Sequence, residues 1–442
     1  MDDALENAEV LEPSSDHTDL YLQSVPRPIA SVHGGSKLRP CYSFYAVNFG
    51  ASENRLGQVY SEFVQYLYRI RRSDWRPKAK LIGTQQCDLL VGEAQAGGVE
   101  WAKLGVQRGK PLVNFYRGFQ TLCRKTMMAQ SLQTYAAEAG PSHNNGLTLD
   151  DFLPQTFVFT RKCDQRLEFI EEFRRRERAG LENVWIAKPS GGSHGDDISV
   201  MREENDIVAF LDEQQKAGTP WVLQKYLERP LLLPGGRKFD VRCMVLVTHD
   251  YSIYLYSEGI IRTCSVKYSL DNLNERFAHL ANNCLQEHHP EYGKHEPLNL
   301  MTYESLNQFL KESGQLGPDG RPARLDTHIL PQIEAQIVYS LLAVRSQMEV
   351  HDTAAYRCFN LFGYDFMLDD TCNVSLLEVN SSPTTDPRLI PGLVEEVVRI
   401  AVDPLFPPQH ASASDACEIS ARDGMCARPA FKLIYEPMLQ GR

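Results

Sequence analysis

The sequence lacks the features that mark membrane-spanning, secreted and metal-cluster proteins. No apolar run approaches the ~20 residues that a bilayer-spanning helix needs. The first residues are acidic, and no basic segment precedes an apolar one, so no secretory signal is visible. The 11 cysteines include no CxxC pair and no Cys/His spacing typical of metal sites. An odd number of scattered cysteines favours reduced thiols, and we therefore expect a cytoplasmic protein without membrane contact.

Basic residues are also fewer than acidic residues. The 46 lysine and arginine residues face 57 aspartate and glutamate residues, and the net charge of −11 argues against general nucleic-acid binding. Two segments are locally basic, residues 69–80 and 161–178. They are either solvated helix faces, which is the commoner case, or surfaces that steer an acidic protein partner toward the molecule.

Residues 365–380 predict a hairpin that carries oxygen ligands. Two apolar runs, 361–368 and 374–379, flank a turn rich in Asp, Thr and Asn. Strand alternation places Glu378 and Asn380 on one face, where Asp365 joins them from the neighbouring strand. Two carboxylates and an amide oxygen suit Mg²⁺ bound together with phosphates. The alternative is a surface hairpin with solvated acids.

A Gly/Ser-rich stretch follows Lys188. It lies between short apolar runs at 184–187 and 198–201, and it is neither a Walker loop nor a GxGxxG fingerprint because no helix signal follows the glycines. Glycine N–H groups can close around phosphate oxygens, and lysine adds a positive charge, so the segment suits a phosphate flap. An ordinary hairpin loop is the commoner alternative for this segment alone.

Charged residues also open a long apolar strand at 237–248. Lys238, Asp240 and Arg242 fall on one face by strand alternation, and a second strand, 252–261, ends in Arg262. Charges at the head of a buried strand are costly unless they are paired or bind a ligand, which favours a functional site over a structural network. Upstream, the run 221–227 suits either the edge of a purine or a plain buried strand.

Five motifs occur in a recognisable order. They are Lys188-Pro-Ser-Gly-Gly, Gln224-Lys-Tyr-Leu, Arg237-Lys-Phe-Asp-Val-Arg242, Leu361-Phe-Gly-Tyr-Asp365-Phe and Leu377-Glu-Val-Asn380. This order resembles the tubulin tyrosine ligase and ligase-like family of ATP-grasp enzymes, over residues 115–405. The resemblance implies an α/β (α+β) ATP-grasp fold with a small N-terminal α/β domain, and ATP and Mg²⁺ as ligands.

The resemblance also implies a reaction and a role for each site residue. A carboxylate attacks the γ-phosphate of ATP, and an amine then attacks the resulting acyl phosphate to form an amide. Asp365, Glu378 and Asn380 would bind Mg²⁺. Arg242 and Arg262 would hold the transferring phosphate and the acceptor carboxylate, with Asn282 near the acyl phosphate. The ATP contacts would be Lys188, Ser190, Gly191, Gly192, Gly195, Ile198, Gln224, Lys225, Tyr226, Leu227, Lys238 and Asp240.

Within the family, several segments resemble the tyrosine ligases more than the polyglutamylases or glycylases. These segments are 114–125, 183–188, 231–240, 279–282 and 431–433. We therefore expect a monomeric, cytoskeleton-associated enzyme that adds free tyrosine to the C-terminal glutamate of detyrosinated α-tubulin, recognising the α/β-tubulin dimer through its acidic tail. The alternatives are a glutamylase or glycylase, for which we expect a long basic extension after the core, and a catalytically inactive tubulin-binding protein.

Some positions depart from the family pattern. His194 stands in place of a lysine, Asp197 in place of a glycine and Ala281 in place of a threonine, and residues 266–268 read Val-Lys-Tyr where Glu-Pro-Tyr is usual. These departures fall in the flap and at the expected amino-acid pocket.

Composition and pattern divide the chain into four parts. Residues 1–38 hold seven acids before the first basic residue, Arg27, which predicts a disordered acidic extension. We expect a tubulin-recognition domain at 39–110, a central ATP-grasp domain at 111–226 and a C-terminal ATP-grasp domain at 227–442 with a loose loop at 407–430. Beyond the strands already given, the predicted helices are 58–69, 118–135, 165–178, 206–216, 330–348 and 392–402, and the predicted strands are 42–47, 80–82 and 431–435.

Overall fold

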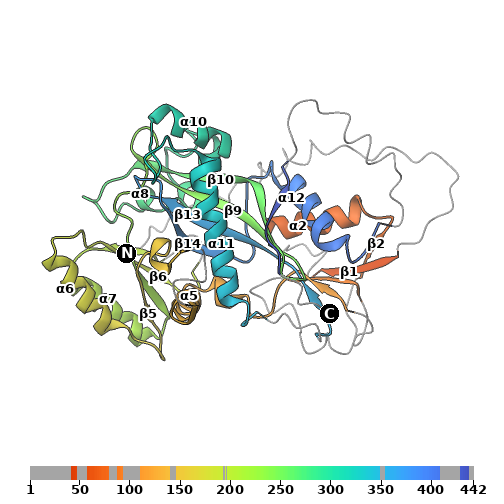
Figure 1. Ribbon diagram of the computed structural model, residues 1–442, viewed down its shortest axis with the longest axis horizontal. Helices are drawn as coiled ribbons and strands as arrows, with labels where there is room; N and C mark the ends of the chain where they lie inside the picture. Colours follow the sequence, from red (N-terminus) through yellow and green to blue (C-terminus); the bar gives the residue numbers. More distant parts are fainter. Residues whose placement is uncertain are drawn as a thin grey trace, which may run out of the picture. The chain divides into compact units, whose positions relative to one another are not determined.

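Three β-sheets with packed helices make up the part of the chain that this computed structural model describes (Figure 1). The described residues are 41–46, 57–78, 87–92, 110–139, 146–192, 195, 197–348, 354–408 and 429–437. All of them belong to one unit, residues 40–442. The predicted mixed α/β fold class is confirmed. Within the described ranges, no helix has the length and apolar character needed to cross a membrane.

The first sheet is parallel, with the strand order β12-β4-β3-β1-β2. Helix α2 (Gln58–Arg69) buries Val59, Phe63, Val64 and Leu67 along one face, as the apolar spacing requires. Strand β12 comes from the distant residues 357–358 and pairs with β4. The strands are β1 (Tyr42–Ala46), β2 (Trp75–Pro77), β3 (Leu89–Val91), β4 (Leu112–Val113) and β12 (Arg357–Cys358). The predicted strand at 80–82 lies outside the described residues.

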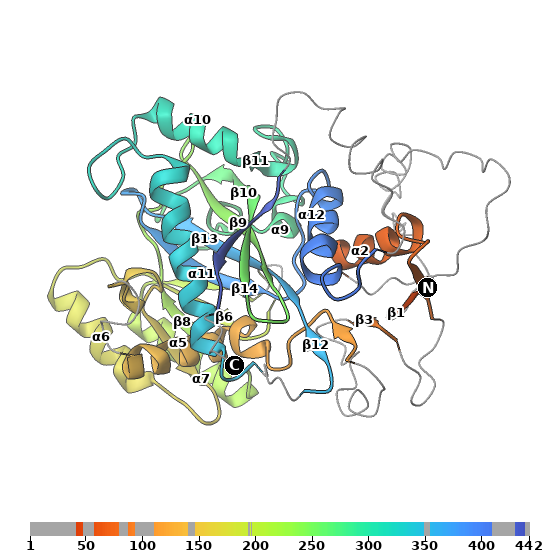
Figure 2. The same ribbon diagram turned by 45° about the vertical axis from the view of Figure 1, so that its right-hand side comes forward.

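The central sheet is antiparallel, with the order β11-β10-β9-β13-β14, and β15 pairs with β10. Every residue of β9 and of β13 is buried, because helices and neighbouring strands enclose both strands. Helix α11 (Leu330–Val344) packs against this sheet through Ile333, Ile337 and Leu341 (Figure 2). The strands are β9 (Arg237–Val247), β10 (Ile253–Lys267), β11 (Leu300–Thr302), β13 (Asn360–Leu368), β14 (Val374–Asn380) and β15 (Phe431–Tyr435).

The third sheet is also antiparallel, with the order β5-β8-β6-β7. Its core packs Phe157 and Trp185 edge-to-face against Phe169 of helix α6. The elements are β5 (Thr156–Phe159), β6 (Trp185–Pro189), β7 (Ser199–Met201), β8 (Trp221–Lys225), α6 (Arg166–Arg178) and α7 (Glu204–Ala217). The two strands expected around the flap are therefore present and pair with each other.

The predicted helices are present with shifted ends. The helix expected at 118–135 is two helices, α4 (Gln120–Cys123) and α5 (Lys125–Ala139), because Arg124 adopts an extended backbone between them. The last predicted helix begins earlier as α12 (Ile390–Val397) and ends in a π-helix, η4 (Val398–Val402). The other helical elements are η1 (Leu149–Asp151), α8 (Arg276–His279), α9 (Asn283–Gln286), η2 (Pro297–Asn299), α10 (Tyr303–Ser313) and η3 (Leu325–Ile329). Residues 409–428 of the predicted loop lie outside the described part.

Candidate active site

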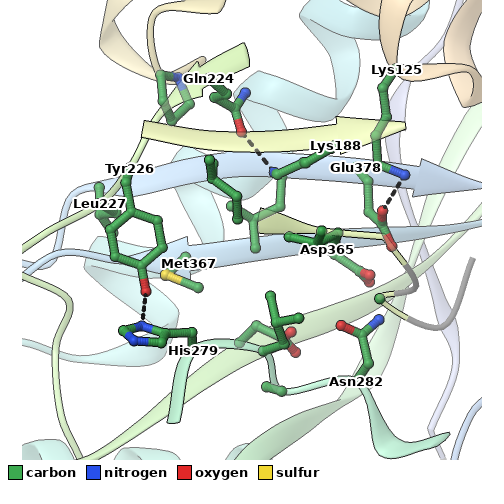
Figure 3. A pocket seen from close by; sticks show the side chains of 18 of the residues that line it. Lys125, Lys188, Gln224, Tyr226, Leu227, His279, Asn282, Asp365, Met367 and Glu378 are labelled. Atoms are coloured by element: carbon green, nitrogen blue, oxygen red, sulfur yellow. Dashed lines mark hydrogen bonds and ion pairs between the residues drawn. The ribbon is translucent and has the colours of Figure 1, made fainter. Parts of the chain in front are cut away.

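A pocket lies between the third sheet and the central sheet (Figure 3). Strands β6 and β8 line one side, and β9, β10, β13 and β14 line the other. Among the described residues that line it, five are lysine or arginine and three are aspartate or glutamate. Cations therefore outnumber carboxylates, which suits a polyanionic ligand. The charged residues are Lys125, Lys188, Lys225, Lys238, Arg262, Asp240, Asp365 and Glu378.

Strand register assembles a row of charges across the central sheet. Asp240 on β9 lies opposite Arg262 on β10, and the two form a bidentate pair with both N–O distances at 2.6 Å. Arg242 lies opposite Asp365 on β13 and forms a second bidentate pair, also at 2.6 Å. A 2.9 Å contact from Nη2 of Arg262 to Asp365 joins the two pairs. These buried charges are thus compensated by one another, as burial requires.

The three expected metal ligands lie together. Asp365 is opposite Glu378 in the β13–β14 register, and the Asn380 amide nitrogen lies 3.5 Å from Asp365 Oδ2 and 3.3 Å from Glu378 Oε1. Two carboxylates and an amide fit Mg²⁺ that also binds phosphate oxygens. No group of three His, Cys, Asp or Glu side chains with metal-binding geometry occurs in the described residues, so a metal here would also rely on Asn380 and on the ligand.

Lys125 is the counterion of Glu378. Its Nζ lies 2.9 Å from Glu378 Oε2 and donates to the carbonyl of Gly192 at 3.3 Å (Figure 3). Burial alone would raise the pKa of Glu378, but the charges of Lys125, Arg242 and Arg262 outweigh burial and hold this pKa well below its usual range. Glu378 therefore stays ionised and available to a cation.

Two lysines are almost completely buried in the pocket. Lys188, at the end of β6, donates to Gln224 Oε1 at 2.8 Å, and Lys238 donates to the Tyr226 hydroxyl at 2.7 Å. Burial lowers the pKa of Lys188 to about 8, with a further contribution from the charge of Lys125. Burial also lowers the pKa of Lys238 to about 8. Neither lysine forms an ion pair among the described residues, so both charges would gain from an anionic ligand.

The flap is tied to its surroundings by backbone and side-chain contacts. The hydroxyl groups of Ser190 and Thr126 lie 2.7 Å apart, and the Arg276 guanidinium donates to the carbonyl of Gly195 at 2.7 Å. Asp197 has φ of +58°, a left-handed conformation that is usual for glycine, the residue that the family pattern places there. His194 lies outside the described residues.

The segment 224–227 has one backbone donor left for a ligand. The N–H groups of Lys225 and Tyr226 donate to the carbonyls of Gln155 and Val184. Within the described part, the N–H of Leu227 donates to no acceptor, although Leu227 lines the pocket. The Lys225 ammonium is held by Glu228 and by backbone carbonyls. In the described part, the Leu227 N–H is therefore the backbone donor of this segment that a ligand in the pocket can use.

Comparison with known proteins identifies the family. The family model described as "Tubulin-tyrosine ligase family" matches residues 107–411. The chain belongs to the tubulin-tyrosine ligase family. Its mixed α/β architecture, with a pocket between two sheets, agrees with the ATP-grasp fold that the motifs implied.

Curated relatives give a finer comparison. The chain is similar to "Tubulin glycylase 3C" of Tetrahymena thermophila, at 33% identity over 51% of this chain and 21% of the relative. It is also similar to "Tubulin glycylase 3D" of that organism, at 30% identity over 60% of this chain and 25% of the relative. A third similar protein is "Tubulin monoglycylase TTLL3" of Danio rerio, at 31% identity over 55% of this chain and 32% of the relative. The chain thus spans about a fifth to a third of the length of these relatives.

These comparisons do not support tyrosine as the transferred amino acid. The tyrosine expectation was based on short segments such as 114–125 and 279–282, whereas all three relatives carry glycylase names over alignments of 235 to 280 residues. The family assignment from the motifs is confirmed. The alternative of a glycylase within the family is the better supported one.

For this family member, the structure brings most predicted site residues to the pocket or to its charged wall, whereas Ser190 and Gly191 of the flap do not line the pocket. Asn282 caps α9 without a side-chain capping bond and faces the flap, where a Cβ at Gly195 would meet its Oδ1 at 3.3 Å. Sequence reasoning assigned no role to Lys125 or to His279. Both belong to segments quoted only for their resemblance, and the spacing between distant segments gives no sign that they meet.

Proposed function

We propose that this chain is an ATP- and Mg²⁺-dependent ligase that attaches glycine to a carboxylate of tubulin. One observation supports the ligase most strongly. The pocket combines two buried lysines without carboxylate partners and a set of oxygen ligands, Asp365, Glu378 and Asn380, within one sheet face. Phosphoryl transfer needs charge neutralisation and positioning rather than a protein nucleophile, and this arrangement provides both.

Each part of the pocket has a defined task in this proposal. The N–H of Leu227 contacts the purine edge, while Lys188 and Lys238 neutralise the phosphates. Asp365, Glu378 and Asn380 hold Mg²⁺, which supplies further neutralisation when it is bound. Lys125 lies between Glu378 and the Gly192 carbonyl, so its ammonium would be placed to neutralise the phosphates if Glu378 bound a metal instead.

Arg262 is the group proposed to face the reacting carboxylate. Its Nε and Nη2 are used by Asp240 and Asp365, whereas its Nη1 donates to no acceptor among the described residues. An acceptor carboxylate that binds at Nη1 is held next to the γ-phosphate, so its oxygen attacks the γ-phosphorus in line, ADP leaves and the acyl phosphate forms. Glycine then attacks through its amine, phosphate leaves, and an amide results.

Tubulin as substrate and glycine as donor are supported by the names of the relatives. The basic segments do not single out the acidic tail as the binding partner. Arg174 and Arg175 of α6 pair with Glu204 and Glu172, and Arg71 pairs with Asp403. Their pairing with neighbouring acids favours the interpretation as solvated helix faces. Association with the cytoskeleton follows only from tubulin as substrate.

An incorporation assay tests the proposal. Tubulin is incubated with the protein, MgATP and one radiolabelled amino acid at a time: glycine, tyrosine or glutamate. We expect labelling with glycine, dependent on ATP, and loss of labelling in Glu378→Gln. Labelling with tyrosine alone, or no labelling with any of the three, contradicts the proposal.

A further inference from the structure

A chain of three hydrogen bonds leads from the pocket to the loop before α8, and Figure 3 shows its middle bond, between Tyr226 and His279. The Lys238 ammonium donates to the Tyr226 hydroxyl at 2.7 Å, and this hydroxyl lies 2.8 Å from His279 Nδ1. His279 Nε2 lies 3.0 Å from the carbonyl of Asn272. Lys238, Tyr226 and His279 are all buried, so water does not compete for these hydrogen bonds as it would at the surface.

When the His279 ring is neutral, one arrangement of protons satisfies these three hydrogen bonds. A backbone carbonyl can only accept, so His279 Nε2 carries the hydrogen and Nδ1 of the neutral ring is an acceptor. An ammonium can only donate, so the Tyr226 hydroxyl oxygen accepts from Lys238. The Tyr226 hydroxyl then donates its own hydrogen to Nδ1. The imidazole therefore dictates the direction of the Tyr226 hydroxyl.

The same residue fixes a second donor of Lys238. The backbone carbonyl of His279 accepts from Lys238 Nζ at 3.1 Å. Two of the three ammonium hydrogens are thereby used, and the Lys238 charge lies 4.3 Å from the centroid of the Tyr226 ring. The third hydrogen is left for the pocket, with its direction set by the other two.

We infer that His279 is a positioning residue, whose neutral ring orients the Tyr226 hydroxyl and thereby aims the Lys238 ammonium at the phosphates of bound ATP. This inference rests on the proposed function, because it requires a nucleotide in the pocket. It adds a residue to which the sequence motifs gave no role.

The surroundings of His279 set its response to pH. Lys238 and Tyr226 face it from β9 and the end of β8, the Tyr268 ring packs edge-on at 5.6 Å, and Glu275 lies on its own segment. Burial lowers the pKa of His279, and the charge of Lys238 acts in the same direction, so the ring is neutral at neutral pH. Protonation in acid turns Nδ1 into a donor, which removes the acceptor of Tyr226 and adds a charge near Lys238.

Calorimetric titration with MgATP across pH 5.5 to 8.5 tests the inference without tubulin or an amino acid. His279→Phe keeps an aromatic ring but has no acceptor, whereas His279→Asn places Oδ1 close to the position of Nδ1. At neutral pH we expect His279→Phe to bind MgATP about ten-fold more weakly than wild type, and His279→Asn to stay within about three-fold. Tyr226→Phe should match His279→Phe and provides the same test if the latter does not fold.

The acid side of the titration separates positioning from packing. Wild-type affinity should fall in acid relative to His279→Asn, because only the wild type has a ring to protonate. The terminal phosphate of ATP, with a pKa of about 6, titrates equally in all variants, so its effect cancels in the ratio of wild-type affinity to His279→Asn affinity. Equal weakening in His279→Phe and His279→Asn would show a packing role and overturn the inference, as would wild-type affinity in His279→Phe. Absence of MgATP binding to the wild type would instead overturn the proposed function, and this inference with it.

Discussion

Arg242 and Asp365 face each other across β9 and β13, and their side chains form a bidentate ion pair with both N–O distances at 2.6 Å. Asp365 is 1% exposed and also accepts from Arg262. Its carboxylate is therefore fixed before any ligand arrives. A carboxylate fixed in this way can bind a metal without a change in its own position.

The two arginines should differ in their effect on catalysis. Arg242 donates from Nε and Nη2 to Asp365 and from Nη1 to the carbonyl of Thr384. Nη1 of Arg262, by contrast, has no acceptor among the described residues and can bind a ligand. Arg262→Lys keeps the charge but loses the planar contact, so turnover should fall by about 100-fold. Arg242→Lys should lower turnover less. Steady-state kinetics of both variants provide the measurement, and a larger loss in Arg242→Lys would reverse the assignment.

Loss of the Glu378 charge should abolish ligation without unfolding the protein. Glu378→Gln removes a ligand of the expected metal and the partner of Lys125, and we expect turnover to drop by about 100-fold or more. Glu334→Gln is a matched control, since Glu334 forms a surface ion pair with Lys432 and should affect neither turnover nor stability. Turnover close to wild type in Glu378→Gln would exclude the β13–β14 hairpin as the metal site.

The sequence predicted elements more successfully than contacts between them. The β13–β14 hairpin and the β9–β10 hairpin follow from paired apolar runs, and the face shared by Lys238, Asp240 and Arg242 follows from the period of two. The break at Arg124 was missed, because no glycine or proline marks it between residues 119 and 135. The pairs Arg242–Asp365 and Lys125–Glu378 join residues more than 100 positions apart, and no local pattern encodes such pairs. The parallel pairing of β12 with β4 was missed for the same reason.

MgATP binding should weaken as the pH rises through about 8. The pKa values of Lys188 and Lys238 are both lowered to about 8 by burial, so each ammonium loses its charge there in the free protein. Bound phosphates favour the charged form, so binding should take up protons above pH 8 and almost none at pH 6.5. Calorimetry in two buffers with different ionisation enthalpies measures this uptake. Equal, negligible uptake at both pH values would contradict the role of the lysines.

Gly363 should be intolerant of a side chain. It lies on β13, and a Cβ there would come within 2.6 Å of Pro383 Cβ, next to the Thr384 carbonyl that holds Arg242. Gly363→Ala should lower the free energy of unfolding by about 1–3 kcal/mol, as overpacking does. Urea denaturation gives the value. The cost should be smaller when Pro383 is also changed to Gly, which removes this Cβ, and an equal cost in both backgrounds would show that Pro383 is not the obstacle.

The most direct test of the central claim is tandem mass spectrometry of the tubulin product. Tubulin ending in glutamate and tubulin ending in tyrosine are each treated with the protein, MgATP and a mixture of glycine, tyrosine and glutamate. The proposed function predicts glycine on tubulin carboxylates in both substrates, and none with Glu378→Gln. Tyrosine at the C-terminus of the glutamate-ending substrate alone would contradict glycylation and restore the tyrosine expectation.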